Sequence, residues 1–328
     1  MKYLITGATG FIGPYVVRRM VSMGHGCRCL VRKDSKTQHL EGPGVDIVKG
    51  DITKPETLKG IADGMEGLLH LATLGHMSNF RVTGAMFNTV NVQGTVNIMN
   101  EAIRSGVGRI VHCSSVAGMG ICPEVPATEE SACNPHHPYG ISKLRAEKEV
   151  LHLISSRGLP AVIVRFSMVY GPGDWRDVLR LTRMAKKGLF PKIGNRPKLT
   201  PLIHADDAVQ GLLLAVEKGR AGEIYLITNK QSEPFDQIIK IIRNALGVRR
   251  PLYYAPEWLA LLSASMLEKS FGLFGKAPPV TRKNLESTLA DRVFSIEKAR
   301  RELGFEPKVD PEKGLMETVR WYREKGWV

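Results

Sequence analysis

Two residues four positions apart, Tyr139 and Lys143, could together act as an acid/base catalyst. Residues at this spacing lie on the same face of a helix, which brings a phenol beside an ammonium group. A free tyrosine has a pKa near ~10, so a phenolate at neutral pH requires about 4 kcal/mol of stabilisation. One positive charge about 4 Å away supplies roughly that much where the effective dielectric constant is near 20. The same spacing also occurs on ordinary surface helices, so the pair needs support from elsewhere in the chain.

A glycine-rich loop near the N-terminus provides that support. Residues 2–6 read as a buried strand and residues 14–23 as a helix, and the loop between them carries Gly7, Gly10 and Gly13. Glycines let backbone amides approach a pyrophosphate, and the N-terminus of the following helix attracts the same anion. The first two glycines are three apart, which differs from the G-x-G-x-x-G fingerprint. Combined with the tyrosine and lysine, the loop favours a dinucleotide-binding enzyme.

The alternation of elements predicts an α/β fold. Helical patterns alternate with short apolar strands at residues 27–31, 45–49, 67–71, 109–113 and 160–165, which is typical of right-handed βαβ units. With 328 residues, 43% of them hydrophobic, the chain can bury one nucleotide-binding domain and a smaller lobe. We predict a Rossmann-type doubly wound parallel sheet with a smaller, mostly helical C-terminal substrate lobe.

The predicted boundaries divide the chain into two parts. We place the Rossmann domain at residues 1–170, with residues 200–228 returning to it. The substrate lobe takes residues 171–199 and 229–328. The first strand begins at once and glycines interrupt its apolar run, so we expect no signal peptide and no membrane span, and a cytoplasmic location.

The cysteines suggest neither a disulfide framework nor a metal site. There are five, scattered along the chain, and an odd number argues against systematic pairing. Cys122 and Cys133 lie near His136 and His137 in the sequence, but their spacing fits no standard zinc pattern. We therefore expect no bound metal.

Motifs spread over 200 residues resemble the extended short-chain dehydrogenase/reductase family, also labelled NAD-dependent epimerase/dehydratases. Besides the two motifs above, they are Gly50-Asp-Ile52, Leu69-His-Leu-Ala72, Asn91-Val-Gln-Gly-Thr95, His112-Cys-Ser-Ser115, Val164-Arg165, Tyr170-Gly-Pro172 and Ile203-His-Ala-Asp-Asp207. The C-terminal third resembles the branch of 3β-hydroxysteroid dehydrogenases, dihydroflavonol reductases and hopanoid-associated epimerase-like proteins. That part of the resemblance rests on Pro256 through Phe274, Ala277 to Thr281, Phe294 to Ala299, Leu303 to Phe305 and Val319 to Tyr322.

The resemblance implies a catalytic set of Ser115, Tyr139 and Lys143. In the family mechanism the lysine binds the nicotinamide ribose and lowers the pKa of the tyrosine, which exchanges a proton with the substrate oxygen. The serine polarises that oxygen, and a one-residue slip would put Ser114 in its place. Asn91 is expected to hold its helix beside the site. The implied cofactor contacts are Gly7, Thr9, Gly10, Phe11, Ile12, Gly13, Arg32, Lys33, Asp51, Ile52, Leu71, Ala72, Thr73, Asn91, Tyr139 and Lys143.

The end of the second strand favours NADP(H). NAD-preferring relatives place an acidic residue there to bind the ribose 2′-hydroxyl, whereas this chain has Val31. Arg32 and Lys33 follow, and an arginine can bind a 2′-phosphate through charge-assisted hydrogen bonds. The alternative is a solvated basic pair at a strand end. We expect NADP as the cofactor, with NAD as the second choice.

The substrate lobe carries much of the positive charge. Residues 176–198 contain eight basic residues and one acid, a local charge of +7 within a net charge of +14. Arg176, Arg180, Arg183 and Lys187 share one helix face, which is either a solvated face or a basic rim for an anionic substrate. Such a substrate could be a nucleotide sugar or an acyl-coenzyme A. Nucleic-acid binding is not expected, because there is no reader motif and no aromatic interleaving.

Two further features bear on the substrate. Many sugar-nucleotide epimerases carry an arginine four residues before the position of His204, where this chain has Thr200, although Lys198 or Arg196 could substitute. The run from Trp258 to Leu267 has no charge. It could be a core helix, an apolar wall of the substrate site or a helix on a membrane surface.

The function we expect is an NADP(H)-dependent oxidoreductase that interconverts a secondary alcohol and a ketone. The alternatives are a nucleotide-sugar epimerase or dehydratase with tightly held NAD(P), and a non-catalytic NADP-binding sensor or scaffold. The intact Ser115, Tyr139 and Lys143 set disfavours the last. The partner is expected to be a small-molecule substrate, and the family resemblance predicts a homodimer.

Overall fold

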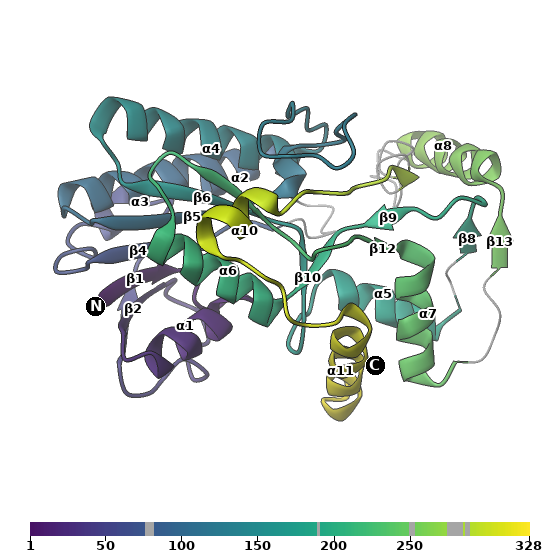
Figure 1. Ribbon diagram of the computed structural model, residues 1–328, viewed down its shortest axis with the longest axis horizontal. Coiled ribbons are helices and arrows are strands. Elements are labelled where there is room, and N and C mark those ends of the chain that lie inside the picture. The colour runs from purple at the N-terminus through teal and green to yellow at the C-terminus, as the bar shows by residue number, and fades with distance from the viewer. Residues whose placement is uncertain (76–81, 189–190, 249–252, 274–284, 286–288) are drawn as a thin grey trace.

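Seven parallel strands form the central sheet (Figure 1). They are β1 Lys2–Thr6, β2 Gly26–Val31, β3 Val45–Lys49, β4 Gly67–His70, β5 Arg109–Ser115, β6 Ala161–Phe166 and β11 Ile224–Ile227. Their order is β11-β6-β5-β4-β1-β2-β3. Most strands are apolar runs because both faces of the sheet are covered. The order confirms the predicted Rossmann-type sheet.

The computed structural model describes residues 1–328 except 76–81, 189–190, 249–252, 274–284 and 286–288. Among the residues that support the family resemblance, Phe274 and Ala277 to Thr281 therefore lie outside the described residues.

Helices cover both faces of the sheet (Figure 1). One face carries α2 Gly84–Phe87, a π-helix at Asn88–Gln93, α3 Gly94–Arg104 and α4 Pro138–Arg157, and the other carries α1 Gly13–Ser22, α6 Ala205–Lys218 and α10 Glu297–Leu303. Short 3-10 helices lie at Pro55–Thr57 and Val116–Gly118. Successive side chains of a strand point to opposite faces, so Ile5 joins one core and Leu4 the other.

The remaining elements form a smaller, mostly helical part at one end (Figure 1). They are β7 Met168–Tyr170, α5 Asp177–Lys186, β8 Pro191–Ile193, β9 Leu199–Thr200, β10 Leu202–His204, β12 Glu233–Pro234, α7 Phe235–Leu246, β13 Tyr253–Ala255, α8 Glu257–Leu273 and α11 Pro311–Glu324. The core between α5, α7 and α11 contains Val178, Ile238, Ile242 and Leu315. No helix in the described part of the chain has the length and apolar character needed to cross a membrane.

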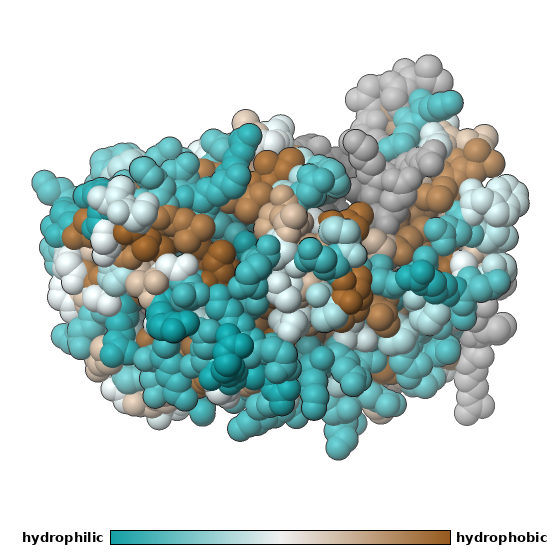
Figure 2. All heavy atoms as spheres, turned by 45° about the horizontal axis from the view of Figure 1, so that its top comes forward, coloured by the Kyte–Doolittle hydropathy of each residue, from teal (hydrophilic) through white to brown (hydrophobic). Residues whose placement is uncertain are grey.

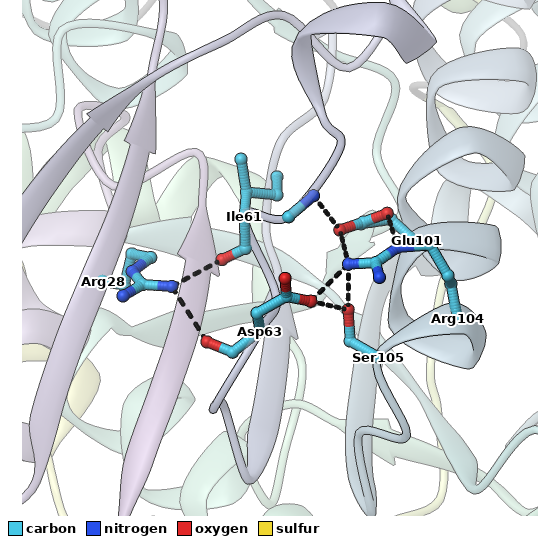
Figure 3. Close-up of polar contacts among 7 residues, drawn as sticks. Arg28, Ile61, Asp63, Glu101, Arg104 and Ser105 are labelled. Carbon is cyan, nitrogen blue, oxygen red and sulfur yellow. Dashed lines mark hydrogen bonds and ion pairs between the residues drawn. The ribbon is translucent and has the colours of Figure 1, made fainter.

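A polar network fastens the segment before β4 to β2 and α3 (Figure 3). Nη1 of Arg28 donates to the carbonyl oxygens of Ile61 and Asp63, each at 3.1 Å. The Asp63 carboxylate pairs with Arg104, whose Nε also donates to Glu101 at 2.8 Å. These contacts fix the approach to β4, whose far end reaches the candidate site.

Candidate active site

The glycine loop lies at the carboxyl end of β1, between β1 and β4. Gly7 has a φ of +74°, and a Cβ on it would lie 2.6 Å from the backbone nitrogen of Ala72. A Cβ on Gly13 would lie 2.2 Å from the carbonyl oxygen of Ala8. Only glycine fits these two positions. The chain crosses from one half of the sheet to the other at this point, which is where doubly wound sheets bind ligands.

The first turn of α1 leaves backbone amides available to an anion. No described side chain caps this helix: Ile12 is at the N-cap and Pro14 follows in the first turn. The uncapped amides and the helix dipole suit a pyrophosphate. The backbone amides of Leu71 and Ala72 donate to Thr6, each at 3.2 Å, so these residues border the loop. This cradle fits a dinucleotide cofactor.

Thr9, Gly10 and Phe11 complete the loop in different ways. Thr9 and Gly10 are half-buried, and the Gly10 amide donates to the Gly7 carbonyl at 2.9 Å. Phe11 is buried. The Arg176 guanidinium lies 4.7 Å from the centre of the Phe11 ring, which is a cation–π contact. The start of the substrate part therefore packs on the glycine loop.

The ends of β2 and β3 carry the residues predicted for the adenosine half. Arg32 and Lys33 are exposed directly after β2. The Asp51 carboxylate accepts hydrogen bonds from the amide and hydroxyl of Thr53, at 2.9 and 2.8 Å. Burial acts to raise the pKa of Asp51, but these hydrogen bonds and the nearby Arg32 charge bring it below its ordinary value. Ile52 is buried beside them.

Tyr139 and Lys143 both lie in the first half of α4. Lys143 is buried, and its Nζ donates to the carbonyl oxygen of Cys113 on β5 at 2.6 Å. Burial lowers the pKa of Lys143 to about 8, although Cys113 and Glu147 act in the opposite direction. The lysine is thus held against the sheet.

Several neighbouring groups act on the pKa of Tyr139. Burial raises the pKa of Tyr139, while a hydrogen bond with Ser115 and the charge of Arg176 act to lower it, and Asp177 acts to raise it. Lys143 donates to the Cys113 carbonyl, and the lowering of the Tyr139 pKa by Lys143 stays a prediction. Burial therefore favours the protonated phenol.

The two neighbouring serines at the end of β5 have different partners. The Ser115 hydroxyl hydrogen-bonds Tyr139 and accepts a hydrogen bond from the Ala117 amide at 3.2 Å. The Ser114 hydroxyl donates to Glu147 Oε1 at 2.5 Å. The geometry therefore brings Ser115, and not Ser114, to the tyrosine.

Asn91 lies in the π-helix and is almost completely buried. Its Oδ1 accepts from the Leu74 amide at 2.7 Å and the Thr73 hydroxyl at 3.1 Å. Its Nδ2 donates to the Leu74 carbonyl at 3.1 Å and to the Ser142 hydroxyl on α4 at 2.9 Å. These contacts join the segment after β4 to α4 and use the hydrogen-bonding groups of the Asn91 side chain.

Sequence reasoning assigned no role to the ion pair of Glu147 and Arg165. Both side chains are buried, and Arg165 Nη2 lies 2.8 Å from Glu147 Oε2. The pair joins α4 to β6, and the Ser114 contact joins it to β5. A sequence signal existed: Glu147 follows Lys143 by four residues, and Arg165 lies inside an apolar strand.

Three of the basic residues expected near the substrate have carboxylate partners. Arg196 pairs with Asp291, Lys198 lies 3.3 Å from Glu257, and Arg176 Nε lies 2.9 Å from Asp174. In a separate ladder, Thr200 on β9 stands opposite Glu233 on β12. The Thr200 position thus faces a carboxylate.

Comparison with known proteins identifies the family. The model of the NAD dependent epimerase/dehydratase family matches residues 3–228. "Sterol demethylase protein B" of Methylococcus capsulatus is 29% identical over 100% of both chains. The "putative dihydroflavonol 4-reductase" of Synechocystis is 29% identical over 99% of this chain and 96% of the relative. The crystal structure of gox2253 superposes with a TM-score of 0.87 at 31% identity, covering 99% of each chain.

The chain therefore belongs to the NAD-dependent epimerase/dehydratase family of enzymes, as its motifs predicted. The family model spans β1 to the residue after β11, so it includes every strand of the central sheet.

The buried ion pair gives a testable prediction. Glu147→Gln removes the charge opposite Arg165 and should lower the free energy of unfolding by about 3–5 kcal/mol, because a buried guanidinium is left unpaired. The measurement is chemical denaturation. As a control, Glu297→Gln breaks an exposed pair with Arg300 at 3.0 Å and should cost at most about 1 kcal/mol. Equal effects of the two changes would contradict the account.

Proposed function

We propose that the protein is an NADP(H)-dependent oxidoreductase that interconverts a secondary alcohol and a ketone. The observation that carries this proposal is the contact of Ser115 with Tyr139 at the carboxyl end of β5, with Lys143 four residues further along α4. A nicotinamide cofactor, when bound, supplies or accepts the hydride. Ser115 and Tyr139 would bind the substrate oxygen, and Tyr139 would exchange the proton with it.

Tyr139 would act as the proton donor when a ketone is reduced. Burial, which raises the pKa of Tyr139, favours the protonated phenol, and that form can donate a proton to a developing alkoxide. Oxidation would need the phenolate. A positive charge brought near the phenol, or a shift of Lys143 towards it, would favour that form.

The cofactor proposal rests on Arg32. Its side chain is exposed at the end of β2, and no carboxylate among the described residues forms an ion pair with it. A 2′-phosphate at this place would gain a charge-assisted contact, whereas Val31 offers nothing to a 2′-hydroxyl. The family as a whole is described as NAD dependent, and we infer that this member prefers NADP.

Arg32→Ala should weaken NADPH binding without affecting NADH. We expect the preference of the wild type for NADPH to shrink by about 1.5–3 kcal/mol, the usual cost of hydrogen bonds to charged groups. Calorimetric titration of both cofactors measures it. Arg19→Ala, at an exposed position in the last turn of α1, serves as the matched control and should leave the preference unchanged. Equal NADPH and NADH affinities in the wild type would refute the assignment.

The substrate proposal is a largely apolar ketone or alcohol. A diphosphate at the Thr200 position would face Glu233, and the basic residues that could replace the missing arginine are held by carboxylates. The names of the two relatives, a sterol demethylase protein and a dihydroflavonol reductase, point to the same class of compound. Buried apolar area, at about 25 cal/mol per Å², would supply most of the binding energy.

The second candidate is a nucleotide-sugar epimerase or dehydratase. The family includes such enzymes, and the +7 charge between residues 176 and 198 favours it. It shares the first hydride transfer but regenerates its cofactor. The predicted homodimer and cytoplasmic location are compatible with either candidate.

A substrate test separates the two candidates. Added apolar ketones of steroid, flavonoid or 3-ketoacyl type should consume NADPH, measured by its absorbance. UDP-sugars should bind weakly, and any binding should weaken further at high salt, because salt screens charge-driven contacts. Micromolar UDP-sugar binding with an epimerised product and no net NADPH oxidation would establish the second candidate instead.

A further inference from the structure

α8 presents its apolar side chains to solvent. Trp258, Leu262 and Met266 follow one another at four-residue spacing and are 66%, 50% and 61% exposed. Leu259 and Leu267 beside them are also exposed. A surface helix normally turns its apolar face inward and its polar face outward. Here the arrangement is reversed, which excludes the core-helix interpretation for most of this run.

Two alanines and a leucine lie on the inward side of α8. Ala264 is 3% exposed, and Ala260 and Leu261 are half-buried. The alanines let α8 pack close to the rest of the molecule, while most of its large apolar side chains stay exposed to solvent. Hydrophobic side chains gather at this end of the molecule in Figure 2, next to hydrophilic ones. Contiguous apolar patches of this kind mark interaction sites.

Basic residues border the apolar face. Tyr254, which is exposed just before α8, stands opposite Lys192 in the ladder of β13 and β8. The side chain of Lys192 is 40% exposed and lies 3.7 Å from Asp236, a surface ion pair that contributes little. Lys269 is exposed on α8 itself. The chain as a whole carries a net charge of +14.

We propose that α8 lies flat on an anionic lipid surface. Trp258, Leu262 and Met266 would enter the boundary between headgroups and acyl chains, and Lys192 and Lys269 would face the headgroups. Interfacial helices bind membranes through this combination of apolar area and attraction to anionic lipids. α8 has 17 residues and is not long and apolar enough to cross a membrane. It would therefore lie on the bilayer surface.

The charge of the chain favours lipid over a second copy. A symmetric dimer through α8 would bring together two chains that each carry a net charge of +14, which costs free energy. An anionic surface instead complements them. The inference does not depend on the proposed substrate, although membrane contact would place the substrate lobe where apolar ketones dissolve.

Vesicle co-sedimentation of the full-length protein tests the proposal. The wild type should pellet with vesicles of equal phosphatidylcholine and phosphatidylglycerol, less with phosphatidylcholine alone, and less at high salt. The double change Leu262→Ser and Met266→Ser should weaken binding by at least about tenfold, because two buried apolar side chains are lost. Met316→Ser, an exposed methionine on α11, is the matched control and should bind as the wild type does.

Controls for folding and self-association complete the experiment. Both variants should keep the wild-type midpoint of thermal unfolding and NADPH affinity, because the changed side chains are exposed. A wild type that stays in the supernatant, or equal loss of binding in the control variant, would overturn the proposal. So would a concentration-dependent dimer, seen by light scattering, that the double variant abolishes, since the face would then bind a second copy.

Discussion

The buried ion pair of Glu147 and Arg165 is the constraint on which the catalytic side of the molecule depends. A charged pair inside a protein is stabilising only when its hydrogen bonds are complete, so its geometry tolerates little displacement. Arg165 donates from Nε and Nη2 to the Glu147 carboxylate, which also accepts from Ser114. This fixes α4 against β5 and β6. On the same helix, Tyr139 lies about two turns before Glu147 and contacts Ser115. Lys143 lies about one turn before Glu147 and donates to the Cys113 carbonyl.

A second constraint shapes the cofactor side. The close approach of Gly7 to the backbone of Ala72, and of Gly13 to Ala8, brings the loop, the end of β4 and the start of α1 together. Arg176 joins the two sides, since it stacks on Phe11 and also acts on the pKa of Tyr139. The Arg176 guanidinium thus contacts the glycine loop and also acts electrostatically on the Tyr139 phenol.

Much of the fold could be predicted from the sequence because its signals are local. Apolar strands alternating with helices, and glycines at a strand end, depend on neighbouring residues alone, and the structure confirms the sheet that they predict. The placement of Tyr139 and Lys143 on one helix follows from spacing in the same way. What spacing could not show is the partner of each side chain. Lys143 donates to a carbonyl on β5, and Glu147 on the same helix pairs with Arg165 on β6.

The substrate half was harder to predict for the same reason. The basic residues between 176 and 198 read as a free positive surface, but Arg196 and Lys198 are held by Asp291 and Glu257, which are distant in the sequence. The apolar run from Trp258 reads equally well as a core helix, and only tertiary packing shows that its large side chains are exposed. Long-range pairing and burial are properties of the assembled chain, so no local pattern encodes them.

The central claim is that Tyr139 transfers the proton during hydride transfer, and a single-turnover measurement tests it most directly. The wild type and Tyr139→Phe would be loaded with NADPH and mixed with the best ketone substrate, and the rate of NADPH oxidation recorded together with NADPH affinity. Tyr3→Phe removes a buried hydroxyl from β1, away from the site, and is the matched control. The account predicts a rate at least ~10² lower in Tyr139→Phe, with NADPH affinity and the control variant unchanged. A near wild-type rate in Tyr139→Phe would contradict it.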